Sequence, residues 1–165
     1  EKYHQAYFNQ FKNVWAHGDF AAITEHKGLI IYGRSDATLN AGGVRIGTAE
    51  IYRQVEKFPE VLESLAIAQR WDNDTRIILF VRLREETPLS ETLIKAIKEK
   101  LKQDASPHHV PAKIIAVPDI PRTINGKIVE LAVSQVVHGE TINNLFALAN
   151  PEALDYFKAL PELSN

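Results

Sequence analysis

From residue 48 onward, the chain alternates between segments with the apolar spacing of amphipathic helices and short, strongly apolar segments typical of strands. The segment TAEIYRQVEKF at 48–58 predicts a helix with Thr48 as its N-cap. Segments 62–71 and 76–85 predict two strands joined by WDNDT, and the second is so apolar that we expect it at the centre of a sheet. This alternation favours an α+β fold in which helices pack on a small sheet.

The second half of the chain continues the same pattern. Ser90 is a suitable N-cap for the helix SETLIKAIKEKLKQ, and AKIIAV at 112–117 predicts a third strand. VELAVSQVV at 129–137 predicts a further helix, and the tail NPEALDYFKAL predicts a short amphipathic helix that starts at Pro151. Three strands with helices between them predict a small α+β domain over 36–165.

The first 35 residues differ from this domain. Interleaved aromatic side chains occupy residues 1–19, and DFAAIT and GLIIYGR then predict a hairpin of two strands around the turn EHKG. After Arg34, the segment SDATLNAGGVRIG lacks periodicity and contains adjacent glycines, so we expect a loop or a short, sharply bent ribbon. A domain boundary is therefore expected at 34–37.

The overall composition excludes several classes of function. Nineteen Lys and Arg residues face 21 Asp and Glu residues, and no basic stripe with interleaved aromatic residues occurs, so nucleic acid and anionic membranes are not expected as partners. No apolar run reaches the roughly 18 to 20 residues of a membrane span. The chain has no cysteine, which excludes disulfides and thiolate chemistry and fits a cytoplasmic location.

A lysine directly follows a tight-turn signal in DIPRTINGK at 119–127. Asn-Gly is typical of a hairpin turn, and from its end Lys127 can extend an ammonium group away from the surface. An isolated lysine of this kind is usually only a solvated side chain. Here Pro118, Pro121 and Arg122 restrict the approach to the turn, and that rigidity favours a functional position for the cation.

A second candidate cluster is GRSD at 33–36, followed by GGVRIG. Adjacent glycines let a ligand approach the backbone closely, Arg45 can contact a phosphate, and Arg34 and Asp19 can hydrogen-bond sugar hydroxyls. Each piece also has a purely structural interpretation, because Gly-Gly is usually a turn and Asp36 can cap it. The residues alone leave both interpretations open.

His108 and His109 raise the question of a metal site. Neighbouring residues on a strand point to opposite faces, so this pair lacks the HxH or HxxxH spacing of a chelate. We therefore expect no metal site built by this chain.

Four motifs follow one another along the chain: HGD at 17–19, GRSDATL at 33–39, GGVRIGTAEIY at 42–52 and PRTINGK at 121–127. Their order and approximate spacing resemble the adenylate-forming acyl-CoA synthetase family of AMP-binding enzymes, and the resemblance covers nearly the whole chain. It implies a two-step ligase, in which ATP and a carboxylic acid form an acyl-adenylate and the thiol of coenzyme A then displaces AMP.

The resemblance also implies roles for individual residues. Lys127 is similar to the lysine of the adenylation step, where a positioned ammonium stabilises the charge that builds up as the carboxylate attacks the α-phosphate. Asp19 and Arg34 resemble the pair that binds the ribose hydroxyls, and Arg45 lies where relatives contact nucleotide phosphate. The Mg²⁺ that accompanies ATP would be bound mainly by a large domain that this chain lacks.

The same resemblance implies a division of the chain at Asp36, which matches the family hinge. Residues 1–35 would be the C-terminal end of the large domain, and 36–165 a mobile C-terminal lid, in which Gly42 and Gly43 line the CoA tunnel. The phosphate loop, adenine pocket and acyl pocket of the family are absent, and the sequence contains no methionine. We therefore expect a piece of a longer protein, inactive alone, whose partners are ATP, the acid, CoA and the rest of its own chain.

Several features favour family members that act on acetoacetate: Asn40, SPHHVP at 106–111, Glu130 in place of a basic residue, and ANPEAL at 149–154. Another short-chain acid, such as acetate, propionate or butyrate, is an alternative substrate, because no acid-pocket residue lies in this segment.

Two positions depart from the family pattern. Ala37 follows the hinge aspartate where a second acidic residue is common, and His108 stands where acetate-specific relatives have an arginine linked to CoA phosphates. A different class of function also stays open: a non-catalytic α+β module that docks a partner protein, with the NGK turn and the Gly-Gly loop as plain surface.

Overall fold

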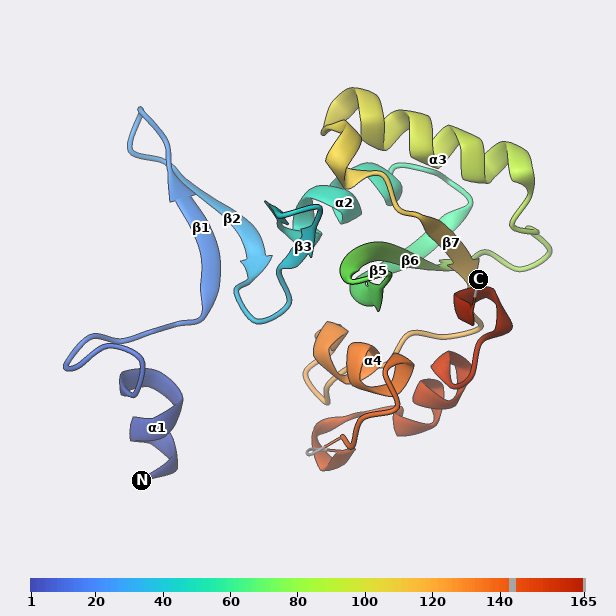
Figure 1. Cartoon of the computed structure of the whole chain (residues 1–165). Helices are drawn as coiled ribbons and strands as arrows, with labels where there is room; N and C mark the ends of the chain where they lie inside the picture. Colours follow the sequence, from blue (N-terminus) through green and yellow to red (C-terminus); the bar gives the residue numbers. More distant parts are fainter. Residues whose placement is uncertain (143–144, 165) are drawn as a thin grey trace.

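The computed structural model describes residues 1–142 and 145–164. Asn143, Asn144 and Asn165, which fall within the expected domain 36–165, lie outside the described residues. The described chain has an α+β architecture built around a three-stranded sheet (Figure 1).

The central sheet has the strand order β5-β6-β7, formed by Val61–Trp71, Asp74–Leu83 and Lys113–Ala116. β5 and β6 are antiparallel across a tight turn, whereas β7 pairs with β6 in parallel. A parallel partner requires a crossover connection, which contains helix α3 (Glu91–Asp104). The prediction of a central second strand is confirmed, because residues 77–81 of β6 are all buried.

Each face of the sheet carries its own hydrophobic core, because consecutive strand residues point to opposite faces. On one face, α2 (Thr48–Val55) and α3 pack in the same cluster as Leu79. On the other face, α4 (Glu130–Val137) and the tail pack in the same cluster as Phe80. Figure 1 shows α2 and α3 on one side of the sheet and α4 with the C-terminal segment on the other.

The starts of the two helices on the first face confirm one predicted cap and correct the other. The Ser90 hydroxyl accepts a hydrogen bond from an N–H of the first turn of α3 at 3.2 Å, as predicted. The N-cap of α2 is Gly47, so the prediction of Thr48 as the cap is wrong. The Thr48 hydroxyl instead donates a hydrogen bond to Glu130 at 3.3 Å.

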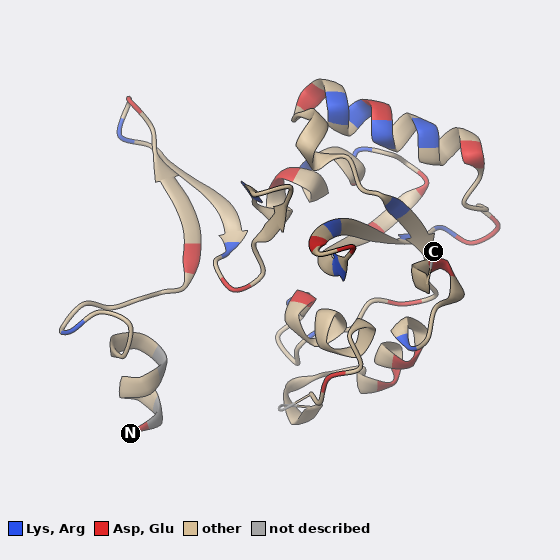
Figure 2. Cartoon of the chain, viewed as in Figure 1, with Lys and Arg blue, Asp and Glu red and all other residues tan. Residues whose placement is uncertain are grey.

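Short 3₁₀ helices account for much of the remaining chain: η1 (Pro107–His109), η2 (Leu145–Ala147), η3 (Pro151–Phe157) and η4 (Pro161–Ser164). The predicted tail helix therefore begins at the expected proline, but its residues form the tighter 3₁₀ type. Figure 2 shows the positions of acidic and basic residues interleaved along α3. No described helix is both long and apolar enough to cross a membrane.

The N-terminal part consists of α1 (Lys2–Phe8), the hairpin of β1 (Asp19–Ile23) and β2 (Leu29–Arg34), and a ribbon of β3 (Leu39–Ala41) and β4 (Val44–Ile46). The hairpin and the bent ribbon agree with the sequence-based expectations. In Figure 1, α1 and the hairpin lie to one side of the sheet and its helices. The chain then enters α2 directly from the ribbon.

Candidate functional site

Lys127 lies at the end of a tight turn with an exposed side chain. The N–H of Thr123 donates to the Lys127 carbonyl at 2.8 Å, and the N–H of Lys127 donates to the Thr123 hydroxyl at 3.1 Å. The N–H of Gly126 also donates to the Thr123 carbonyl at 2.8 Å, and its φ of 76° is the left-handed conformation that glycine favours. Arg122 and Ile128 close the turn as an antiparallel bridge. The turn is therefore fixed by its own hydrogen bonds, while the ammonium is free to extend.

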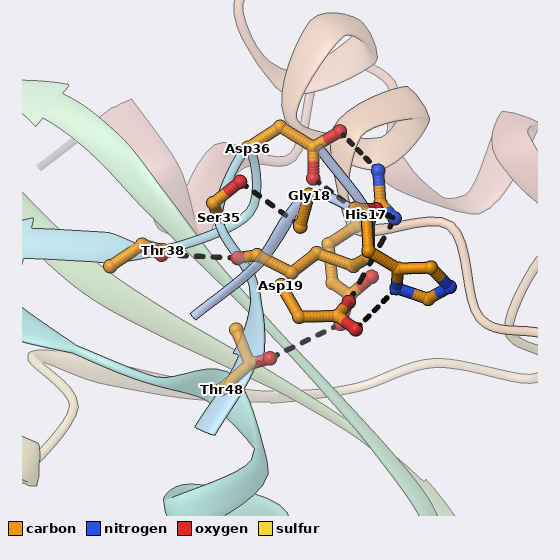
Figure 3. A network of polar contacts seen from close by, with 9 residues as sticks. His17, Gly18, Asp19, Ser35, Asp36, Thr38 and Thr48 are labelled. Carbon is orange, nitrogen blue, oxygen red and sulfur yellow. Dashed lines mark hydrogen bonds and ion pairs between the residues drawn. The ribbon is translucent and has the colours of Figure 1, made fainter. Parts of the chain in front are cut away.

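A second polar cluster surrounds Arg34, the last residue of β2. Figure 3 labels His17, Asp19 and Asp36 of this cluster. Arg34 Nε and Nη2 donate to the two carboxylate oxygens of Asp36 at 3.3 Å each, and its Nη1 donates to the carbonyl of His17 at 3.0 Å. Asp19, paired with Arg34 across the hairpin, has Oδ1 3.9 Å from Nη1. The hydrogen bond to Asp36 raises the pKa of Arg34, although burial acts in the opposite direction.

His17 belongs to this cluster and was given no role in the sequence analysis. Its Nδ1 lies 2.5 Å from Oδ2 of Asp19. The HGD motif placed the two residues close in sequence, but only the hairpin geometry brings both next to Arg34. Carboxylate oxygens held in this way can accept hydrogen bonds from the hydroxyl groups of a ligand.

Lys127, Arg34 and Asp36 line one cavity of about 460 Å³, whereas Asp19 and His17 are not among the described residues that line it. Lys127 and Thr123 line it from the turn, Arg34 and Asp36 from the end of the hairpin, and Glu130 from the start of α4. The structure thus brings together three residues that the sequence analysis selected from segments about 90 positions apart. A cavity with both cationic and carboxylate groups can bind a ligand that carries phosphate and hydroxyl groups.

Gly42, Gly43 and Arg45 lie elsewhere; none of them is among the described residues that line this cavity. The two glycines form the tip of the β3–β4 ribbon, with φ values of 59° and 74°. The guanidinium carbon of Arg45 lies 5.0 Å from the centre of the Phe20 ring, over its face. Arg45 therefore contacts β1 and not the Lys127 turn.

A group of hydrogen bonds behind the cavity was also missed by the sequence analysis. Glu130 Oε1 accepts a hydrogen bond from the Tyr52 hydroxyl at 3.0 Å, in addition to the one from Thr48. Burial, followed by the negative charge of Glu130, raises the pKa of Tyr52 well above its ordinary value. No local signal predicts these contacts, because the partners are about 80 residues apart in sequence.

The two adjacent histidines lie in η1 and not on a strand, so the reasoning from strand geometry does not apply to them. His109 is buried, with Nδ1 2.8 Å from the Ser106 hydroxyl and Nε2 3.4 Å from a carboxylate oxygen of Glu50, whereas His108 is exposed. Within the described ranges, no three His, Cys, Asp or Glu side chains form a group that could hold a metal ion.

Comparison with known proteins identifies relatives of this architecture. Residues 53–127 match the family model for the AMP-binding enzyme C-terminal domain. The chain is 62% identical to the acetoacetyl-coenzyme A synthetase of Rhizobium meliloti (strain 1021) and 46% identical to that of Xenopus tropicalis; each match covers 99% of this chain and 25% of the relative. The solved acetoacetyl-CoA synthetase from Streptomyces lividans is similar with a TM-score of 0.88 and 35% identity, over 99% of this chain and 25% of that one.

The chain therefore spans about a quarter of the length of the relatives that it matches. Both the sequence and the fold agree with these relatives across nearly all of this chain. The chain belongs to the AMP-binding enzyme C-terminal domain family, in the form found in acetoacetyl-CoA synthetases.

Proposed function

We propose that this chain is the C-terminal part of an acetoacetate–CoA ligase. The reaction converts ATP, acetoacetate and CoA to acetoacetyl-CoA, AMP and diphosphate through an acyl-adenylate. The observation that carries the proposal is the 62% identity, over 99% of the chain, to a relative named acetoacetyl-coenzyme A synthetase. The exposed lysine at the tip of a hydrogen-bonded turn supports it, because the chemistry requires a positioned cation.

Lys127 is the adenylation residue in this proposal. Negative charge develops as the carboxylate attacks the α-phosphate, and an ammonium group held at that point stabilises the transition state more than the ground state. The turn presents Lys127 to a reaction centre that is built mainly by the large domain. The Mg²⁺ that accompanies ATP is also bound mainly by that domain. The exposure of Lys127 supports this role, because a buried amine would be unable to reach a nucleotide on another domain.

The other predicted site residues bind the nucleotide, form the hinge or leave room for CoA. Asp19 and Arg34 bind the ribose hydroxyls, and Arg45 contacts nucleotide phosphate. Asp36 is the hinge of the lid, which comprises residues 36–165. At this hinge the lid changes its orientation relative to residues 1–35 and the large domain between the two half-reactions. The hydrogen bonds between Arg34 and Asp36 support a hinge at this point, since a change of backbone torsion there would alter both.

The other contacts of CoA and the location of the enzyme follow from the same proposal. Gly42 and Gly43, at the open tip of the β3–β4 ribbon, leave room for the thiol arm of CoA. We place the enzyme in the cytoplasm because its cysteine-free sequence suits a reducing compartment.

The test separates the two half-reactions of the complete enzyme. With Lys127→Ala, acetoacetate-dependent ATP–pyrophosphate exchange should fall by about 10²–10³-fold, as for loss of one transition-state donor. Formation of the thioester from supplied acetoacetyl-adenylate and CoA should not change. Lys95→Ala, which removes an exposed lysine on α3, is the matched control and should leave both rates unchanged. Equal loss of both half-reactions with Lys127→Ala would contradict the assigned role.

A substrate screen tests the assignment of acetoacetate as the carboxylic acid substrate. The value of kcat/KM for acetoacetate should exceed those for acetate, propionate and butyrate when each is measured with the complete enzyme. A preference for one of the other acids would overturn the substrate assignment while leaving the reaction type intact.

A further inference from the structure

The C-terminal tail is hydrogen-bonded directly to the turn that carries Lys127. The N–H of Ile124 donates to the Ala147 carbonyl at 3.0 Å, and the N–H of Ala149 donates to the Arg122 carbonyl at 2.9 Å. The first limb of the turn is therefore paired on both sides: with its own second limb and with residues 147–149 of the tail.

Asn150 completes this connection with its side chain. Its Oδ1 accepts a hydrogen bond from the N–H of Arg122 at 2.9 Å. Its Nδ2 donates to the carbonyl of Ile120 at 3.1 Å and to the carboxylate of Asp119 at 2.7 Å. One half-buried amide thus makes three hydrogen bonds to the segment that leads into the turn, and both of its polar atoms are used.

The tail is itself fixed to the sheet, so it can act as a rigid support. Phe157 of η3 is fully buried, and its ring packs edge-on against Phe80 of β6 with the ring centres 4.8 Å apart. Leu148 and Leu154 belong to the same hydrophobic cluster. Movement of residues 147–150 would therefore require part of this core to move as well.

We propose that Asn150 is a positioning residue for Lys127, and that residues 147–150 brace the lysine turn during adenylation. The inference rests on the proposed function, because it assigns Lys127 to that step. Residues 147–150 lie outside the segment 53–127 that matches the family model, so the support comes from a part of the chain beyond that model. A displacement of a catalytic group by about 1 Å can lower a rate by about 10²-fold, so a brace on the turn has kinetic consequences.

The test uses the complete enzyme and the same two half-reactions. Asn150→Ala should lower the maximal rate of acetoacetate-dependent ATP–pyrophosphate exchange by about tenfold or more, with little change in KM for ATP. Thioester formation from supplied acetoacetyl-adenylate should stay unchanged. In a Lys127→Ala background, Asn150→Ala should cause no further loss of exchange, because a positioning residue acts only through the group that it positions.

Two variants control for surface and stability effects. Glu152→Ala removes an exposed side chain of the same tail and should leave the exchange rate unchanged. Ile67→Val trims the buried core beneath the tail and should lower the Tm without lowering exchange selectively.

Three results would contradict the role of Asn150 as a positioning residue. Asn150→Ala would leave the exchange rate unchanged, would reduce both half-reactions equally, or would cause the same fold-loss of exchange in the Lys127→Ala background as in the unmodified enzyme. If Lys127→Ala reduces exchange and Asn150→Ala does not, only the brace fails. If Lys127→Ala leaves exchange unchanged, the role of Lys127 fails and the brace fails with it.

Discussion

The hydroxyl group of Tyr52 donates to Oε1 of Glu130 at 3.0 Å and accepts a hydrogen bond from the N–H of Ala66 at the same distance. Tyr52 belongs to α2 and Glu130 to α4, which pack on opposite faces of the sheet. Ala66 lies on β5, one of the two edge strands of the described sheet, where outward N–H groups have no strand partner. The tyrosine therefore joins the two layers around the sheet edge and supports the first residue of the helix that follows the lysine turn.

Replacement of Tyr52 by phenylalanine should destabilise the protein by about 1–3 kcal/mol, because the Ala66 N–H and the Glu130 carboxylate each lose a partner in a partly buried place. The free energy of unfolding, measured with urea, checks this. Tyr156→Phe is the matched control, because Tyr156 is 42% exposed and its loss should cost less than about 0.5 kcal/mol. Equal effects of the two substitutions would contradict a structural role for the Tyr52 hydroxyl.

The Glu63 carboxylate should make stability depend on pH in the acid range. Burial raises its pKa, but hydrogen bonds from Arg122 and Arg82 outweigh burial, so the pKa of Glu63 lies below its ordinary value. Glu63 therefore binds a proton less readily in the native state than in the unfolded chain, where glutamates titrate at about pH 4.3. The contribution of Glu63 is complete above that pH and is lost as the pH falls through the native pKa.

In Glu63→Gln, the free energy of unfolding should accordingly decline less steeply with acidification below about pH 4.3. Denaturant unfolding at a series of pH values measures this slope. Glu99→Gln, on the exposed face of α3, should keep the slope of the unmodified protein. Parallel curves for Glu63→Gln and the unmodified protein would show that the two arginines do not stabilise this carboxylate.

Gly47 should not tolerate a side chain, because of close contact between α2 and β2. A Cβ atom at this position would lie 2.3 Å from the carbonyl oxygen of Tyr32, which is backbone and cannot rotate away. Its φ of −83° suits any residue, so the cost of Gly47→Ala is steric and should reach about 1–3 kcal/mol or more. In Gly28→Ala the nearest atom is the Thr24 hydroxyl at 3.1 Å, which accepts a hydrogen bond from the Gly28 N–H at 2.9 Å and needs to shift by only a few tenths of an ångström. A smaller loss of Tm is therefore expected for Gly28→Ala, and equal losses would contradict the close contact.

The sequence predicted the elements that depend on local pattern. The unbroken apolar run of β6 could only be buried on both faces, which fixed it at the centre of the sheet, and Ser90 could cap a helix without help from distant residues. Asn-Gly placed Lys127 on a turn for the same local reason. These features follow from side chains within a few positions of one another.

Contacts between distant segments were the features that the sequence could not predict. Thr48 looked like a helix cap, but its hydroxyl is used by Glu130, 82 positions away. Asn150 lies in the ANPEAL motif, but nothing near it in the sequence indicates its three hydrogen-bond partners, which lie about 30 positions earlier. The guanidinium group of Arg45 lies over the ring of Phe20 on β1, a contact that no residue near Arg45 in the sequence indicates, and its predicted role at the nucleotide phosphate stays a prediction.

The tip of the β3–β4 ribbon allows the CoA half-reaction to be blocked separately from adenylation. No described heavy atom outside the adjacent residues lies within 4 Å of a Cβ placed on Gly42, so a larger side chain there would point into open space. Its φ of 59° would add a strain of about 1–2 kcal/mol, which leaves the domain folded. Under the proposed function, Gly42→Leu should lower thioester formation from supplied acetoacetyl-adenylate by about tenfold or more and spare ATP–pyrophosphate exchange.

This result would be the reverse of that expected for Lys127→Ala. Gly139→Leu is the matched control, because Gly139 has a φ of 68° and, among the described residues, equally open surroundings at the end of α4. It carries the same backbone strain and should change neither half-reaction. If Gly139→Leu and Gly42→Leu slow thioester formation alike, the effect comes from backbone strain. If only Gly42→Leu slows it, while exchange continues, the ribbon tip lies on the path of the CoA thiol.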